Sequence, residues 1–510
     1  GTEVTMATVS IFTGKEMRSL TVPAGLSLSE ALREGGHAPD MPCGGKGRCR
    51  KCRVLAQGAL SAPTREEQQA LSPRELEQGF RLACCAQVLG DVQVRSAAAG
   101  EVSQICTDGV GRPFVPEPAF SALGAAVDIG TTTLAAQLYS PDGTLLATAA
   151  APNPQRTFGA DVITRIGRAM AGDGPVLAGC VRQAIRGLLD RMCSQAGRSC
   201  GQIDGLVITG NTAMLHLLTG EDPSPLAAAP FQAREFFGRC LSAQELDLPC
   251  APGAEVYLPR CMSAFVGADI TTALLASGIC QGTDTALLAD IGTNGEIALW
   301  HQGILRCCST AAGPAFEGAN LSQGMQGAPG AIDHAWVQED ALALHTIGDL
   351  PAVGICGSGV ADVLAGLLQL GKLDETGFLE DGEDCALTPQ VSFTQKDVRQ
   401  VQLAKSAIRA GMETLLSHAS LTPEAVSSLA IAGGFGSYLS LDSAAAIGLI
   451  PPVLSSRALV LGNAALSGAA MVLQRRSFRE ECQALAQSAQ TVELSTDPVF
   501  MDLYIEHMLF

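Results

Sequence analysis

The 510-residue chain has few charged, aromatic and histidine side chains: 16% of its residues are charged, 4% are aromatic, and seven are histidine. Lysine and arginine number 33 against 51 acidic residues, which gives a formal net charge of −18. Nucleic-acid binding requires a basic surface, so this acidic balance argues against a nucleic-acid partner. No histidine stands beside a serine or cysteine in a nucleophile setting, so covalent catalysis has no support in the sequence.

Long hydrophobic runs are absent as well. No signal-peptide pattern is found near the N-terminus. The longest apolar stretch, residues 458–473, is too short and too interrupted by Gly, Ser and Asn to span a bilayer. We therefore expect no membrane segment and predict a buried strand followed by a helix over 458–473. Eighteen cysteines without a secretion signal indicate a reducing, cytoplasmic location, with thiols serving as metal ligands or small buried hydrophobes.

Three cysteines are concentrated in the basic, glycine-rich segment MPCGGKGRCRKC at residues 41–52. Cys43, Cys49 and Cys52 have the spacing C-x5-C-x2-C, one residue longer in the first interval than plant-type [2Fe–2S] sites. The glycines let backbone N–H groups donate to sulfur, and the neighbouring cations offset the negative charge of thiolates and cluster: Lys46, Arg48, Arg50 and Lys51. The segment predicts a [2Fe–2S] site. A structural zinc site is the alternative, but zinc loops usually supply two C-x2-C pairs.

The fourth cysteine is one of an adjacent pair, Cys84 and Cys85. The pair lies far beyond Cys52 in the chain, as the fourth cysteine does in plant-type sites. Adjacent side chains on a strand face opposite ways, so only one of the pair is expected to be a ligand. We prefer Cys84 and expect Cys85 to be a core thiol. Around the cysteines, short alternating runs predict a hairpin of strands at 8–12 and 19–22 and further strands at 52–55, 81–84 and 91–94. A helix is predicted to begin with a capping box of Ser27 and Glu30, and residues 63–78 have a polar, helical pattern.

A duplicated motif marks the rest of the chain, where β-branched runs alternate with Ala/Leu-rich helices and predict an α/β fold. Residues 125–138 (AAVDIGTTTLAAQL) and 287–299 (LLADIGTNGEIAL) both predict a strand, an Asp-Ile-Gly-Thr turn and a second strand. Their offset of 162 residues suits two copies of a domain. No P-loop pattern is present. A Gly-Thr turn can instead present N–H and hydroxyl groups to phosphate, and the Asp can hold Mg²⁺ through water.

Glycine-rich segments after the second turn favour a nucleotide site: 313–318 (GPAFEG), 354–359 (GICGSG) and 432–436 (AGGFG). Gly433 and Gly434 end a predicted buried strand and leave the backbone open to an adenosine.

Three polar residues have two interpretations each. Glu296 and Glu317 lie near the expected site and could orient water, but an exposed or capping role is the alternative. Asn211 begins a helix, where it either touches a ligand or serves only as the N-cap.

The motifs DIGTTT, DIGTNGE and AGGFG, in this order, resemble the ATPase core of actin, sugar kinases, acetate kinase and heat-shock chaperones, the ASKHA superfamily. Joined to a plant-type ferredoxin, the chain resembles the reductive activators of corrinoid proteins. The resemblance covers nearly the whole chain and extends to these segments: 153–166 (NPQRTFGADVITRI), 210–220 (GNTAMLHLLTG), 265–270 (FVGADI), 311–319 (AAGPAFEGA), 354–362 (GICGSGVAD) and 404–411 (AKSAIRAG).

This resemblance implies a fold and its division. We expect an α/β protein with a β-grasp, ferredoxin-like [2Fe–2S] domain at residues 4–95 and a linker at 96–122. Two RNase H-like halves of an ASKHA unit are expected at 123–284 and 285–510.

The resemblance also implies ATP-dependent, one-electron reduction of inactive Co(II) to Co(I) on a corrinoid protein of a methyl-transfer (demethylase) system. The implied cofactors are a [2Fe–2S] cluster, ATP and Mg²⁺, and the implied partners are the corrinoid protein, an upstream electron donor and a second copy in a homodimer. The implied catalytic residues are Asp128, Asp290 and Glu317. The implied nucleotide-binding residues are Gly130, Thr131, Thr132, Thr133, Gly292, Thr293, Asn294, Gly313, Gly357, Ser358, Gly433 and Gly434. The implied cluster ligands are Cys43, Cys49, Cys52 and Cys84.

Three other functions compete with this one. An ATP-driven donor to another low-potential metalloenzyme, such as a radical dehydratase, would usually lack the N-terminal ferredoxin. A small-molecule kinase with a regulatory cluster would need a substrate pocket and an evident general base. An electron carrier fused to a nucleotide-sensing module would bind ATP without turnover.

Overall fold

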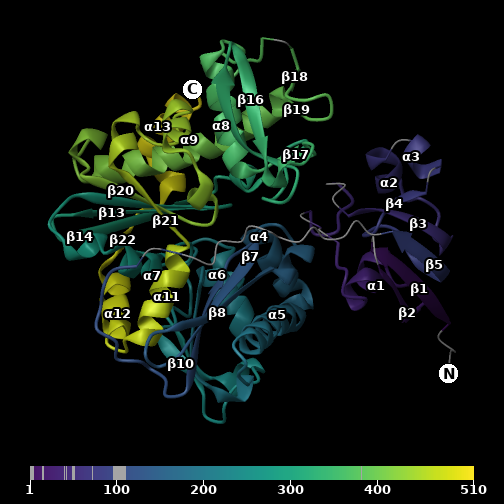
Figure 1. Ribbon diagram of the computed structural model, residues 1–510, viewed down its shortest axis with the longest axis horizontal. Coiled ribbons are helices and arrows are strands. Elements are labelled where there is room, and N and C mark those ends of the chain that lie inside the picture. Colours follow the sequence, from purple (N-terminus) through teal and green to yellow (C-terminus); the bar gives the residue numbers. More distant parts are fainter. Residues whose placement is uncertain are drawn as a thin grey trace. The chain divides into compact units, whose positions relative to one another are not determined.

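The computed structural model describes residues 5–13, 16–39, 41, 43–48, 52–71, 73–77, 79–95, 109, 111–380 and 382–510. The chain forms two compact units (Figure 1): Gly1–Val102 with Pro152–Ala184, and Ser103–Ala151 with Ile185–Phe510. Among the described helices, none combines the length and the apolar character that a membrane crossing requires.

The first unit contains a five-stranded mixed sheet in the order β2-β1-β5-β3-β4 (Figure 1). The predicted hairpin of β1 (Met6–Thr13) and β2 (Glu16–Pro23) is present, and β5 (Val88–Arg95) runs parallel to β1. β3 (Arg53–Leu60) pairs antiparallel with β5 and with β4 (Phe80–Leu82). Apolar side chains of these strands form the core of this part of the unit.

Three short helices complete the ferredoxin-like region. α1 (Leu28–Glu34) begins with the predicted capping box, since Ser27 and Glu30 satisfy each other's backbone N–H groups. The polar stretch after β3 forms two helices, α2 (Arg65–Ala70) and α3 (Pro73–Glu77).

The strand predicted over residues 81–84 ends earlier than expected, at Leu82. The reason is a turn in which the N–H groups of Cys85 and Ala86 both donate to the Leu82 carbonyl. Cys84 and Cys85 therefore lie in a turn, so their opposite orientation cannot be argued from a strand.

The second unit is built around two six-stranded sheets in the orders β10-β11-β9-β6-β7-β8 and β21-β20-β12-β13-β14-β22. The first contains β6 (Leu123–Ile129), β7 (Thr133–Tyr139), β8 (Leu145–Pro152), β9 (Ile203–Gly210), β10 (Arg239–Ser242) and β11 (Glu255–Leu258). The second contains β12 (Ala286–Ile291), β13 (Gly295–His301), β14 (Ile304–Thr310), β20 (Ser428–Ala432), β21 (Ala458–Gly462) and β22 (Gln490–Thr491).

The pairing within the sheets confirms the predicted duplication. β6 pairs antiparallel with β7 and parallel with β9, and β9 pairs parallel with β11. β12 repeats this arrangement with β13, β20 and β21. The two Asp-Ile-Gly-Thr turns therefore occupy equivalent positions, each between the first two strands of its half.

The described residues of both units contain further helices and smaller sheets, and residues 152–184 belong to the first unit (Figure 1). The helices are α4 (Val162–Arg168), α5 (Gly174–Gln195), α6 (Thr212–Thr219), α7 (Ala268–Ser277), α8 (Gly357–Gln369), α9 (Gln395–His418), α10 (Leu441–Ala446), α11 (Ala464–Gln474), α12 (Phe478–Ser488) and α13 (Pro498–Glu506). The minor strands are β15 (Ala331–Gln338), β16 (Ala341–Thr346), β17 (Gly354–Ile355), β18 (Asp384–Ala386) and β19 (Ser392–Thr394).

α7 and α11 lie side by side and share one hydrophobic core, which positions the candidate site (Figure 1). Each helix follows the last parallel strand of its half, so the two are equivalent under the duplication. Gly468 allows the contact, because a Cβ there would lie only 1.8 Å from the Thr272 carbonyl oxygen. The strand and helix predicted over 458–473 are β21 and α11.

Candidate functional site

Asp128 and Asp290 occupy equivalent positions near the ends of β6 and β12. Burial raises the pKa of Asp128 to about 7. The Asn463 amide donates to Asp128 Oδ2 at 3.1 Å and opposes this rise, whereas the charge of Asp290 adds to it. Burial also raises the pKa of Asp290 to about 7, and the charges of Asp269 and Glu317 add to the effect. The two predicted catalytic aspartates therefore belong to one coupled group.

Asp269, in the first turn of α7, is a further member of this group. Its pKa is raised to about 7 by burial and then by the charge of Asp128. Glu296 is 7% exposed, so the exposed role considered from the sequence is wrong for it. Burial raises its pKa well above the usual range, and Asp269 and Asp290 add to the shift.

Within the described residues, no lysine or arginine forms an ion pair with Asp128, Asp269 or Asp290. Like charges in a buried region disfavour ionisation unless a cation joins them, so this donor set fits a divalent cation. No three His, Cys, Asp or Glu side chains of the described part of the chain are close enough to hold a metal directly. The arrangement therefore suits Mg²⁺, which keeps several of its waters.

The first phosphate-turn candidate, Gly130–Thr133, is closed by a hydrogen bond from the Gly130 N–H to the Thr133 carbonyl at 2.9 Å. The side chains of Thr131, Thr132 and Thr133 are half-buried. Asn211 has both roles considered from the sequence: its Oδ1 accepts from the Met214 N–H at 2.8 Å as the N-cap of α6, and its Nδ2 donates to Thr131 Oγ1 at 3.2 Å. The start of α6 is thereby attached to the turn.

The second turn is organised in the same way. The Gly292 N–H donates to the Asn294 carbonyl at 3.2 Å, and the Gly313 N–H donates to the Thr293 carbonyl at 2.9 Å. The Thr293 hydroxyl donates to Glu317 Oε2. The 313–318 segment therefore contacts the turn, and Glu317 reaches the predicted phosphate-binding hydroxyl.

The glycines after β20 lie beside the carboxylate group. Gly433 has φ +95°, and a Cβ there would lie 2.9 Å from Asp290 Oδ1, so a larger residue would be strained and crowded. At Gly434 an added Cβ would meet no atom within 4 Å. This open space is where the sequence predicts an adenosine.

The 354–359 segment is held more tightly. A Cβ at Gly357 would lie 1.7 Å from the Phe316 carbonyl oxygen, so this glycine allows the close approach of α8. The Ser358 hydroxyl donates to the Asp333 carbonyl at 2.9 Å, which gives it a role in the fold.

Asp269 and Asn463 are not among the predicted site residues, although the fold brings both to Asp128. Each lies at the start of a helix that follows the last parallel strand of its half, in FVGADI and LGNAAL respectively. The signal that could identify them is the duplication itself, because equivalent helix starts reach the same cleft in both halves.

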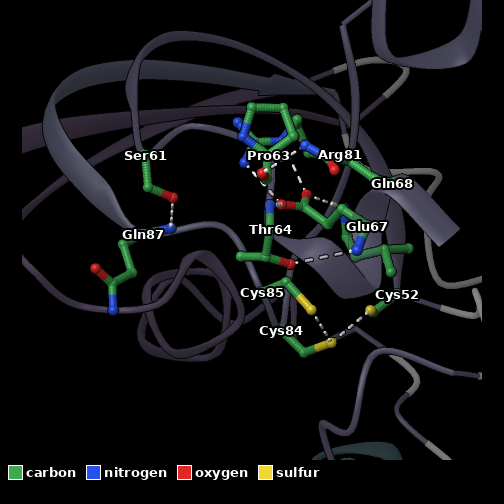
Figure 2. A network of polar contacts seen from close by, with 11 residues as sticks. Cys52, Ser61, Pro63, Thr64, Glu67, Gln68, Arg81, Cys84, Cys85 and Gln87 are labelled. Atoms are coloured by element: carbon green, nitrogen blue, oxygen red, sulfur yellow. Dashed lines mark hydrogen bonds and ion pairs between the residues drawn. The ribbon is translucent and has the colours of Figure 1, made fainter. Parts of the chain in front are cut away.

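The thiols of the ferredoxin-like region converge (Figure 2). Cys52 Sγ lies 3.4 Å from Cys84 Sγ, and Cys84 Sγ lies 3.6 Å from Cys85 Sγ. The hydrogen bond between Cys52 and Cys84 lowers the pKa of Cys52 to about 7 and raises that of Cys84. Cys43 is half-buried, and Cys49 lies outside the described residues. Thiolates are the ligands of iron–sulfur clusters, and the short distance between the Cys52 and Cys84 thiols is compatible with both being ligands.

A buried ion pair supports the turn that carries Cys84 (Figure 2). Glu67 is 0% exposed and accepts from Arg81 through Nε at 2.8 Å and Nη2 at 2.9 Å. Glu67 also accepts from the Leu82 N–H at 3.0 Å, two residues before Cys84. Burial raises the pKa of Glu67, but the bonds from Arg81, Thr64 and Leu82 outweigh it and lower the pKa overall. This pair could not be predicted from the sequence, because α2 has the pattern of a polar surface helix.

Glu67→Gln should destabilise the cluster region, because it leaves the Arg81 guanidinium buried without its carboxylate. Removing one partner of a buried pair typically costs about 3–5 kcal/mol. We expect the visible absorption of the iron–sulfur cluster to be lost at a temperature several degrees lower than in the wild type. Glu66→Gln, at the exposed neighbouring residue, is the matched control and should leave that temperature unchanged. Equal behaviour of the two variants would contradict the supporting role.

Three segments match known protein families. Residues 13–89 match a "2Fe-2S iron-sulfur cluster binding domain", residues 123–282 match the "RACo middle region", and residues 284–510 match the "C-terminal domain of RACo the ASKHA domain". These matches and the topology confirm the predicted fold class. The exact domain boundaries stay predictions.

Three of the similar proteins are corrinoid activators or corrinoid protein reductases by name. The chain is 32% identical to the corrinoid activation enzyme RamQ of Eubacterium limosum over 419 residues, which is 76% of this chain and 70% of that protein. It is 25% identical to the [Co(II) methylated amine-specific corrinoid protein] reductase of Methanosarcina barkeri over 75% of this chain and 76% of that one. A solved reductive activator for corrinoid, iron-sulfur protein superposes with a TM-score of 0.72 at 26% identity and 98% coverage of both chains. The chain therefore belongs to the family of reductive activators of corrinoid proteins.

Proposed function

We propose that this chain reduces the inactive Co(II) form of a corrinoid protein to Co(I) in an ATP-dependent, one-electron reaction. The observation that carries the proposal is the combination of two features in one polypeptide. Converging thiols lie in a ferredoxin-like region, and duplicated phosphate turns flank a group of coupled, buried carboxylates. A small-molecule kinase would need only the second feature.

Energetics explain why the two features belong together. Plant-type clusters have reduction potentials near about −400 mV. Each ~59 mV of uphill one-electron transfer costs about 1.4 kcal/mol, so an acceptor ~200 mV more negative would cost roughly 5 kcal/mol. Electron transfer alone would then rarely be complete. Nucleotide binding and hydrolysis can shift this equilibrium, provided that they favour one state of the complex with the acceptor over the other.

In the nucleotide unit, we propose that Asp128, Asp269 and Asp290 hold Mg²⁺ through its waters. When bound, Mg²⁺ would supply positive charge that offsets the negative charge of the phosphates. Gly130 and Gly292 close the two turns through their own N–H groups. The turns are proposed to face the phosphates with remaining N–H and hydroxyl groups of Thr131, Thr132 and Thr133 from the first and of Thr293 and Asn294 from the second. Gly433 and Gly434 leave room for the adenosine. We propose that Glu317, which accepts from the Thr293 hydroxyl, orients the attacking water.

In the ferredoxin-like region, we propose that Cys43, Cys49, Cys52 and Cys84 ligate the cluster. A bound [2Fe–2S] cluster supplies the single electron. The chain's own contribution is to hold the fourth ligand, since the ion pair of Glu67 and Arg81 fixes the turn before Cys84. We propose the domain division expected from the sequence, with domain or linker ranges of 4–95, 96–122, 123–284 and 285–510. Residues 96–108 and 110 of the linker lie outside the described part of the chain.

The same proposal includes the setting of the reaction. An upstream carrier must supply the electron, and the resemblance to the family supports a homodimer. The thiol-rich composition supports a reducing, cytoplasmic location.

The direct test mixes the reduced protein with a Co(II) corrinoid protein and follows the absorbance of Co(I) with and without ATP. We expect Co(I) to accumulate only with ATP and Mg²⁺, because the electron transfer is uphill. If no Co(I) forms in either case, the kinase and sensor functions regain priority; formation of a phosphorylated small molecule would select the kinase.

Asp269→Asn tests the carboxylate group. This substitution keeps the size of the side chain but removes one charge from the proposed Mg²⁺ site, so we expect kcat for ATP hydrolysis to fall about 10–100-fold. Thermal stability should not fall, because a buried like charge is removed. Asp284→Asn, at an exposed position, is the matched control. Unchanged kcat and Mg²⁺ dependence in Asp269→Asn would exclude Asp269 from the site.

A further inference from the structure

Charge is divided unevenly along the chain. Residues 1–95 contain 12 Lys and Arg against 10 Asp and Glu, whereas residues 96–510 contain 21 against 41. The ferredoxin-like region is therefore slightly positive, with a net charge of +2, and the rest of the chain carries −20. Such an asymmetry affects how fast partners associate, because the long-range electrostatic field of a protein steers charged molecules toward it.

The cations near the cysteines are exposed in the structure. Lys46 and Arg48, which lie between Cys43 and Cys52 in the chain, are both exposed. A cation that served only to neutralise the cluster would be expected to turn toward it and be shielded. These two side chains instead face solvent, where they are available to a second molecule. The exposed Glu66 lies beside Gly47, but the exposed Arg65 next to it balances its charge.

We propose that Lys46 and Arg48 form a docking surface for an acidic, low-potential electron-carrier protein, the donor that reduces the cluster. This inference rests on the proposed function and names the chemistry of its missing partner. In the docked pair the donor loses one electron and the cluster gains one, with no bond made or broken. Docking at the cluster loop places the two redox centres close together.

The charge distribution favours the donor over the corrinoid protein as the occupant. The ATP-dependent step must engage the nucleotide unit, which belongs to the part of the chain that carries −20. An acidic acceptor would be repelled there. Reduction of the cluster requires no nucleotide, so a donor needs to contact only the ferredoxin-like region, where opposite charge accelerates encounter and makes the rate sensitive to salt.

The test uses the full-length holoprotein and a reduced flavodoxin of net negative charge as the donor. Stopped-flow absorbance gives the second-order rate of cluster reduction at low and high salt. The variant is Lys46→Gln with Arg48→Gln. The matched control is Lys372→Gln with Lys396→Gln, which removes the same total charge from exposed lysines of the second unit. The rate of cluster reduction by photoreduced deazariboflavin, a small reductant that needs no protein docking, measures the reactivity of the cluster itself. The midpoint potential of the cluster is measured as well.

We expect the Lys46 and Arg48 variant to react at least about tenfold more slowly with flavodoxin at low salt and to lose most of the salt dependence. Its reaction with deazariboflavin should match the wild type, and its measured midpoint potential corrects the flavodoxin rate for any change in driving force. The control variant should behave as the wild type throughout. Equal slowing in both variants would show a general charge effect and overturn the proposal. So would an unchanged flavodoxin rate with slower Co(I) formation, since the surface would then serve the acceptor. ATP-dependent Co(I) formation after deazariboflavin reduction tests the proposed function separately.

Discussion

The structure of the nucleotide unit depends on burying several carboxylates together without a cationic side chain. Burial, together with the charges of neighbouring carboxylates, raises the pKa values of Asp128, Asp269 and Asp290 to about 7, a perturbation typical of functional sites. The duplication produces this arrangement. Equivalent strands deliver Asp128 and Asp290, and the helix starts that follow each half deliver Asp269 and the amide of Asn463, which bonds to Asp128.

In the ferredoxin-like region, the constraint is to hold cysteine thiolate ligands on loops. The turn at Cys84 has little regular structure of its own. A buried ion pair between Glu67 and Arg81 stabilises this turn in place of a longer strand. Glu67 also accepts a hydrogen bond from the Leu82 N–H. The exposed Lys46 and Arg48 of this region form the surface that we propose for electron entry.

Motifs that repeat or have a fixed spacing could be predicted from the sequence. The two Asp-Ile-Gly-Thr turns, the glycines at 433–434 and the cysteine loop each require specific residue types, so the sequence identifies them. Asp269 could not be found in this way, because a single aspartate at the start of an apolar helix has no motif of its own. Glu67 was equally hidden, since its burial depends on a distant arginine in a strand.

Other differences have local causes. The pair Cys84 and Cys85 was assigned to a strand because the preceding residues alternate, but backbone bonds to Leu82 close a turn there. For Glu296, the sequence leaves an exposed role as an alternative, because glutamate is rarely buried. Its surroundings are also acidic, since Asp269, Asp290 and Glu317 all contribute to its raised pKa, and only the tertiary structure brings these residues together.

The central claim is that the buried carboxylates require a divalent cation before they accept a polyphosphate. Calorimetric titration of the protein with ATP, in excess Mg²⁺ and in excess chelator, measures this directly. The account predicts that metal-free ATP binds at least about 100-fold more weakly, because its charge would meet carboxylates without a cation between them. Equal affinity in the two conditions would contradict the assignment of this cleft as a magnesium-nucleotide site.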